Sequence, residues 1–182
     1  GNFDNILYEI EGMYQFGRRS GLDVSAFAAA TGIGYRFPLP MNPQGWIRYD
    51  FASGDSRHTD GRSNTFNQLF PFGHYYMGFL DRVGRQNIHD FNAQFTMHPM
   101  PWITFITQYH RFYLANNRDF LYNAAGLATL RDVTGQSGSH VGDELDFRLN
   151  LHVSRHQDVL LGYSKLWSGT FLGRQRPGTD PD

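Results

Sequence analysis

The sequence predicts an all-β fold, a transmembrane antiparallel up-and-down β-barrel with about eight strands in this chain. Side chains alternate between apolar and polar with a period of two, and the alternating segments are long. The connections between these segments alternate between short turns and long irregular loops. Strands in globular proteins are most often about 5 to 6 residues long, whereas these segments run to about 9 to 15. Aromatic residues make up 16% of the chain and fall mainly on the apolar face.

The clearest predicted strands are residues 6–16, 22–37, 45–53, 90–98, 103–110, 141–153 and 159–171. The first opposes Ile10 and Tyr14 to Glu9 and Glu11, which fixes its two faces. The turn-like "RRSG" follows it, and the three prolines of "PLPMNPQG" end the second strand. Long loops are predicted at about 54–86 and 115–139, and a single domain is predicted to span 1–182.

The need for every backbone N–H and C=O group to form a hydrogen bond explains why such a pattern suits a membrane. Hydrocarbon offers no partner to an unpaired N–H or C=O, so only a closed ring of strands can cross it with alternating hydrophobicity. A soluble β-sandwich or lipocalin-like barrel also alternates, but its strands are shorter and its buried face is rarely opposed by a row as charged as Glu144, Asp146, Arg148 and His152. The N-terminus lacks a signal peptide, so we expect the chain to be mature or to begin internally, with the barrel incomplete.

Composition and motifs argue against several functions. The formal net charge is −1 with both signs interspersed, which does not suggest a nucleic-acid surface, and the absence of cysteine excludes thiol chemistry and disulfides. The eight histidines are scattered without the spacing of a metal site. No GxSxG, GxGxxG or Walker pattern is present, so we expect no catalytic residues, no enzyme activity and no cofactor.

One Asp-rich segment, "SGDSRHTDGRSN" at 53–64, could hold Ca²⁺ through the oxygens of Asp55, Asp60 and Asn64. Its spacing is not that of an EF-hand. A solvated Asp/Gly-rich loop is the simpler interpretation of the same residues.

The polar faces of the strands are predicted to line a lumen. The basic residues assigned to this lining are Arg36, Arg48, Arg111, Arg148 and Lys165, and the acidic ones are Glu9, Glu11, Asp50, Asp90, Glu144 and Asp146. Charged rings select solutes in wide pores. A mixed lining indicates a channel whose cations bind a polyanion while carboxylates hold those cations in place, although charge pairs that only stiffen the wall give the same pattern.

The segment "TFNQLFPFGHYYMGFLDRVGRQN", residues 65–87, is predicted to be a compact loop that enters the barrel mouth or packs on its rim. Phe66, Leu69, Phe70 and Tyr75 are expected to anchor its core. The residues predicted to act in this pore loop are Phe66, Phe70, His74, Tyr75, Asp81, Arg82 and Arg85, with Gln86 beside them.

Three motifs resemble one family. Residues 52–91, "ASGDSRHTDGRSNTFNQLFPFGHYYMGFLDRVGRQNIHDF", are similar to the signature region of the bacterial alginate-export outer-membrane proteins, in which a strand ending in A-S-G-D precedes T-F-(N/D)-x-L-(F/Y)-P-x-x-H, G-x-x-D and x-Q-N. "FLYNAAG" (120–126) with "SHVGDELDFRLN" (139–150), and "LLGYSKLWSGTFL" (160–172), follow in the expected order. The resemblance thus covers most of the chain from residue 45 onward.

The resemblance implies an eighteen-stranded barrel in the bacterial outer membrane, with an electropositive constriction that passes an anionic uronate polymer to the cell exterior. This chain would be its C-terminal part, and the aromatic-ended last strand of the family would follow the "PGTDPD" region. The expected partners are outer-membrane lipid or lipopolysaccharide, an anionic polysaccharide or small anionic solute, and a periplasmic protein. The alternative function is a structural barrel that scaffolds a partner protein or an electron-transfer complex.

Overall fold

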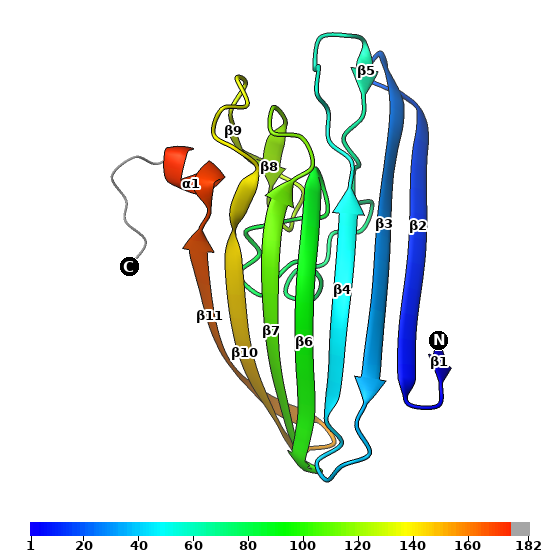
Figure 1. The fold of residues 1–182 in the computed structure, drawn as a ribbon, viewed down its shortest axis with the longest axis vertical. Helices are drawn as coiled ribbons and strands as arrows, with labels where there is room; N and C mark the ends of the chain where they lie inside the picture. The colour runs from blue at the N-terminus through cyan, green and yellow to red at the C-terminus, as the bar shows by residue number, and fades with distance from the viewer. Residues whose placement is uncertain (176–182) are drawn as a thin grey trace.

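Long antiparallel strands make up most of the computed structural model, which describes residues 1–175 (Figure 1). The elements are β1 (Asn2–Phe3), β2 (Ile6–Arg19), β3 (Leu22–Arg36), β4 (Gln44–Ala52), β5 (Arg62–Ser63), β6 (Ile88–Met100), β7 (Ile103–Leu114), β8 (Phe120–Tyr122), β9 (Ala128–Arg131), β10 (His140–Ser154), β11 (Gln157–Ser168) and α1 (Thr170–Gln175). The predicted all-β antiparallel fold is confirmed. Within residues 1–175, the strands of 9 to 15 residues are β2, β3, β4, β6, β7, β10 and β11.

The main sheet has up-and-down topology. Its strand order is β1-β2-β3-β4-β6-β7-β10-β11, so each long strand pairs with the long strand before and after it in the chain. Short turns join strands at the lower end in Figure 1, whereas the long loops that carry β5, β8 and β9 leave from the upper end. The β2–β3 hairpin also turns at the upper end, through Ser20 (φ 52°) and Gly21 (φ 83°). Two positive φ values are what a tight two-residue hairpin turn requires.

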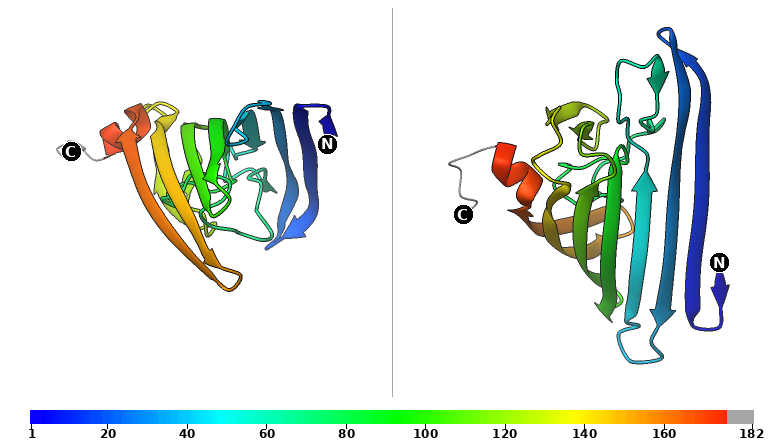
Figure 2. Two further views of the ribbon diagram at one scale, coloured as in Figure 1. Left: turned by 90° about the horizontal axis from the view of Figure 1, so that it is seen from below. Right: turned by 45° about the horizontal axis from the view of Figure 1, so that its top comes forward.

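The register of the ladder separates an apolar face from a polar one. Ile47 of β4 lies between Ile33 of β3 and Ala93 of β6, and Phe147 of β10 lies between Thr107 and Tyr163. Ile47 is 69% exposed. The sheet is curved and open in Figure 2, and the loops lie on its concave side, so this apolar face is convex and bare. An apolar surface of this extent is suited to lipid rather than water.

The concave face buries ionisable side chains where a soluble sheet would bury hydrocarbon. Asp50, Asp90, His110, Glu144 and Asp146 are each at most 4% exposed. Three of them accept hydrogen bonds from the first long loop: Asp50 from Arg85, Glu144 from Leu80 and Asp146 from Phe79. A smaller apolar cluster, which includes Phe66, Val83, Phe112 and Phe171, packs where the loops meet the upper ends of the strands.

The last predicted strand, 159–171, is too long at its C-terminal end. β11 stops at Ser168, and α1 begins at Thr170. A Cβ at Gly169 would lie 2.4 Å from the carbonyl oxygen of His140, so only glycine allows the approach in which the Gly169 N–H donates to the Val141 carbonyl. The chain then turns, and Phe171 is fully buried in the apolar cluster. No helix among residues 1–175 is both long and apolar enough to cross a membrane.

The face assignment predicts the outcome of placing a charge on each side of the sheet. Ile47→Arg puts a cation among apolar outer neighbours, so we expect unfolding in lipid vesicles to require about 2 to 4 kcal/mol less free energy. Thr96→Arg, on the inner face of β6, should cost less than about 1 kcal/mol because its side chain meets the aqueous lumen. Equal losses in denaturant titrations of the two variants would contradict the assignment.

Candidate functional site

The first long loop crosses the concave face of the sheet (Figure 2). On one side, Gln15 of β2 donates to the Asn67 carbonyl at 2.5 Å and accepts from the Asn67 N–H at 2.8 Å. On the other side, the N–H of Leu80 donates to Glu144 at 2.9 Å and that of Phe79 donates to Asp146 at 3.3 Å. Residues 67–80 are therefore held at both ends, against β2 and against β10.

The tip of this loop is closed by one glycine and one carboxylate. Gly78 has φ +83°, a backbone angle that favours glycine, and a Cβ there would lie 2.4 Å from a carboxylate oxygen of Glu144. Asp81 accepts the His74 N–H at 2.8 Å, and its second oxygen lies 3.0 Å from the His74 ring. The sequence predicts none of these contacts, because the loop residues follow no strand or helix periodicity that would place them beside their partners.

The predicted core of the loop is only partly correct. Phe66 is buried at 4% exposure, but Leu69, Phe70 and Tyr75 are 71%, 91% and 61% exposed. They do not anchor the loop, because each of these side chains is mostly exposed. Met77 and Val83 take that role.

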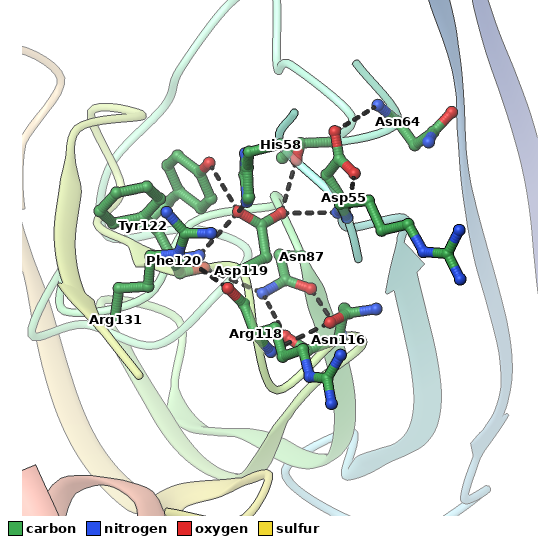
Figure 3. Close-up of polar contacts among 12 residues, drawn as sticks. Asp55, His58, Asn64, Asn87, Asn116, Arg118, Asp119, Phe120, Tyr122 and Arg131 are labelled. Carbon is green, nitrogen blue, oxygen red and sulfur yellow. Dashed lines mark hydrogen bonds and ion pairs between the residues drawn. The ribbon is translucent and has the colours of Figure 1, made fainter. Parts of the chain in front are cut away.

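A buried carboxylate ties the two long loops together (Figure 3). Asp119 accepts hydrogen bonds from the Asp55 N–H at 2.8 Å, the Thr65 hydroxyl at 2.5 Å, the Phe120 N–H at 2.7 Å and the Tyr122 hydroxyl at 3.2 Å. Burial, followed by the charge of Asp119, raises the pKa of Tyr122, so the phenol remains a donor.

Two further residues complete this junction. The His58 ring lies 3.2 Å from Asp119. Asn87 donates to the carbonyls of Asn116 and Phe120 at 3.0 and 2.9 Å and accepts the Asn116 N–H at 2.7 Å (Figure 3). The segments "SGDSRH", "RQN" and "NNRDF" therefore meet in space, although 64 residues separate Asp55 from Asp119.

The oxygens of the predicted Ca²⁺ loop are occupied by its own backbone. Asp55 accepts the N–H groups of Arg57 and Asn64 at 2.9 and 3.3 Å, and Asp60 accepts that of Arg62 at 3.0 Å. Among residues 1–175, no group of three or more histidine, cysteine or acidic side chains is arranged to hold a metal ion. Calcium binding by Asp55, Asp60 and Asn64 stays a prediction.

Three arginines surround one cavity of about 360 Å³ between the loop and the sheet. Arg48 pairs with Glu9 at 2.6 Å and donates to Gln94 at 3.2 Å. Arg85, from the loop, pairs with Asp50 at 2.5 Å. Both guanidinium groups also lie over aromatic rings, Arg48 over Trp46 at 4.3 Å and Arg85 over Tyr76 at 5.0 Å.

The third arginine differs from the other two. Arg148 donates to Gln108 at 3.0 Å and lies 5.6 Å from the ring centroid of Phe79. Its Nε is buried without a hydrogen-bond partner, and within residues 1–175 no carboxylate lies at ion-pair distance from it. Arg148 is thus the cavity cation with the most unused capacity to bind an anion.

The structure does not bring all predicted lining residues to this cavity. Arg111 pairs across the ladder with Phe91 and Asp143, and Lys165 pairs with Leu145, so both lie on the convex face and their prediction as pore lining is wrong. Long basic side chains at the edge of an apolar band cannot be distinguished from lumen residues by polarity alone.

Other predicted residues lie near the cavity without lining it. Arg36 is exposed at the short-turn end of β3, and Arg82 is exposed on the loop. The neutral groups that line the cavity, Tyr76, Asn92, Gln94 and Gln108, were not predicted. The period of two could have found Gln94 and Gln108, because both alternate with apolar residues on their strands.

Long up-and-down strands, a bare apolar convex face, a charged concave face and a loop across it together define an outer-membrane β-barrel channel. The chain belongs to the alginate export family, because the family model described as "Alginate export" matches residues 1–182. This is a family of outer-membrane channels for polysaccharide export and not an enzyme family. A comparison with curated protein sequences gives no match.

The junction in Figure 3 predicts how the loops respond when its acceptor is removed. Asp119→Ala leaves four donors without their partner, and we expect the loops to lose about 3 kcal/mol or more of local stability. Tyr122→Phe removes one 3.2 Å bond and should cost about 1 kcal/mol. Amide hydrogen exchange at Asp55 and Phe120 measures both effects.

A matched control lies in the same loop. Asp132 is half-buried and closes a local turn, in which hydrogen bonds from Thr134 and then Ser137 lower its pKa. Asp132→Ala should speed exchange at Thr134 and Ser137, whose N–H groups donate to it, and leave Asp55 and Phe120 unchanged. If it speeds exchange at Asp55 as much as Asp119→Ala does, the loops are not joined through Asp119.

Proposed function

We propose that this chain forms part of the wall and the constriction of a channel for an anionic polysaccharide of the uronate type. The observation that carries the proposal is the set of guanidinium groups of Arg48, Arg85 and Arg148 around one cavity beneath the loop, with Arg148 free of a carboxylate within residues 1–175. Membership of the alginate export family supports a polysaccharide as the solute.

The mechanism is electrostatic exchange. A carboxylate that enters the cavity finds Arg148 without an ion-pair partner within residues 1–175, and it competes with Glu9 for Arg48 and with Asp50 for Arg85. The resident carboxylates keep each of these bonds weak, since the solute gains only the difference between two ion pairs. Weak binding at several neighbouring sites lets a charged chain enter and move on.

The neutral part of the lining suits sugar rings. The carboxamides of Asn92, Gln94 and Gln108 offer donors and acceptors to hydroxyl groups, and Tyr75 and Tyr76 offer aromatic faces from the loop. The centroids of the two tyrosine rings are 4.7 Å apart, and the rings are arranged edge to face. An inorganic anion would use the arginines alone, so these groups favour a carbohydrate over a small ion.

Loop residues 67–80 supply the constriction in this proposal. They cross the concave face between β2 and β10 and carry the tyrosines that cover the cavity. Long loops of bacterial outer-membrane barrels face the cell exterior. We therefore place the narrow zone below the external mouth, within the membrane-spanning part of the sheet.

Arg148→Gln tests the proposal in the intact protein reconstituted in planar bilayers. A unit charge about 8 Å from a permeating carboxylate, at an effective dielectric constant near 40, changes its energy by about 1 kcal/mol, or about fivefold in occupancy. We expect the preference for anions over cations to fall by about that factor, and block of the current by oligouronates to weaken alongside it.

Arg118→Gln is the matched control, because Arg118 lies exposed in the second long loop away from the cavity. It should leave selectivity and block unchanged. The proposal fails if Arg148→Gln keeps the original anion preference, or if neutral oligosaccharides block the current as strongly as charged ones.

A further inference from the structure

The convex face carries one cluster of charged side chains near the long-loop end of β7, β10 and β11. Asp143 of β10 is its centre, with Arg111 Nε at 3.0 Å, His140 Nε2 at 3.1 Å and a hydrogen bond from the Tyr109 hydroxyl. Lys165 of β11 lies opposite Leu145, the next outward residue along β10. Strand spacings of about 4.8 Å and a rise of about 3.4 Å per residue put the Cα atoms of Arg111 and Lys165 about 12 Å apart.

This cluster lies at the upper edge of the apolar band. Outward positions on β10 are apolar from Leu145 to Val153, which spans about 27 Å along the strand at about 3.4 Å per residue. Outer-membrane barrels carry an apolar band about 25 Å tall, flanked by aromatic girdles. Asp143 is the next outward residue above Leu145, with Trp167 opposite it. The charges therefore sit at the level where lipid headgroups begin.

Positive charge exceeds negative charge in the cluster. Arg111 and Lys165 face the single carboxylate of Asp143, and His140 adds a further cation when it is protonated. Arg111 approaches Asp143 with its Nε at 3.0 Å, and its side chain is 49% exposed. Within residues 1–175, neither its Nη groups nor Lys165 has an acidic partner of its own.

We propose that this cluster binds a phosphate of an anionic lipid headgroup in the leaflet at the long-loop end. Asp143 lies 3.0 Å from the Nε of Arg111, and a guanidinium group offers N–H groups that match the geometry of phosphate oxygens. Lys165 extends its apolar stem along the band and brings its ammonium to the same level. Trp167 and Tyr109 pack at the boundary between acyl chains and headgroups.

This site goes beyond the proposed transport function and does not depend on it. It lies on the opposite face of the sheet from Arg148, so the two sites can fail separately. Contact between charged side chains and acyl chains has a high free-energy cost. That cost falls when the same side chains contact headgroup phosphates.

Native mass spectrometry of the intact protein in neutral detergent tests the proposal, with diphosphorylated lipid A as the anionic probe and phosphatidylcholine as the zwitterionic one. We expect lipid A to stay bound and the double variant Arg111→Gln/Lys165→Gln to bind it at least about tenfold more weakly. Lys165→Gln alone, a change to a half-buried side chain on the outward face of β11, should weaken binding by about fivefold. Phosphatidylcholine binding should not change in either variant.

Arg155→Gln is the control, because it removes one exposed cation at the short-turn end of the same strands. Equal lipid A binding by the double variant and the unmodified protein overturns the proposal, and so does an equal loss in Arg155→Gln. Competition with inorganic phosphate separates the sources of the anion. Displacement of lipid A by equimolar phosphate would show a general anion site instead of a lipid site, and would also overturn it.

Discussion

Register in the antiparallel ladder is the constraint on which every other feature depends. Backbone groups in a membrane must pair within the sheet, and a slip of one residue would exchange the two faces of a strand. Asn92, His110 and Glu144 stand in one inward row across β6, β7 and β10, while Tyr109 and Leu145 stand in the outward row beside it. The charged concave face and the apolar convex face are two consequences of the same hydrogen bonds.

An inward charged face needs partners, and the loop provides them from its backbone. Burying a carboxylate without hydrogen bonds costs several kcal/mol. The N–H groups of Phe79 and Leu80 satisfy one oxygen each of Asp146 and Glu144, and the pairing fixes where the loop tip lies. The sheet thus determines the loop position, and the loop in turn shapes the cavity around Arg148. The inward charges of the sheet are therefore also the anchors of the loop.

Sequence reasoning reached the features that depend on local periodicity. The strands and the inward positions of Arg48 and Arg148 follow from a period of two. The errors at Arg111 and Lys165 arise because a basic side chain at the edge of an apolar band has the same polarity as one in the lumen. The loop was harder, because its contacts join Gln15 to Asn67, and Leu80 to Glu144, across 52 and 64 residues. No local pattern encodes such contacts.

In the proposed function, the cavity combines affinity for anions with no excess of formal charge. Three arginines line it together with the three carboxylates Glu9, Glu11 and Asp50. A strongly positive lumen would hold a polyanion through many simultaneous contacts and release it slowly. Here Arg48 and Arg85 are already paired with Glu9 and Asp50. A carboxylate of the solute must therefore displace a protein carboxylate at each arginine, and its net gain in binding free energy is small. In the proposed mechanism, Arg148, which lacks such a pair within residues 1–175, supplies the asymmetry that favours anions. Transport of a long charged chain needs this balance, since each residue of the polymer must leave the site as readily as it arrived.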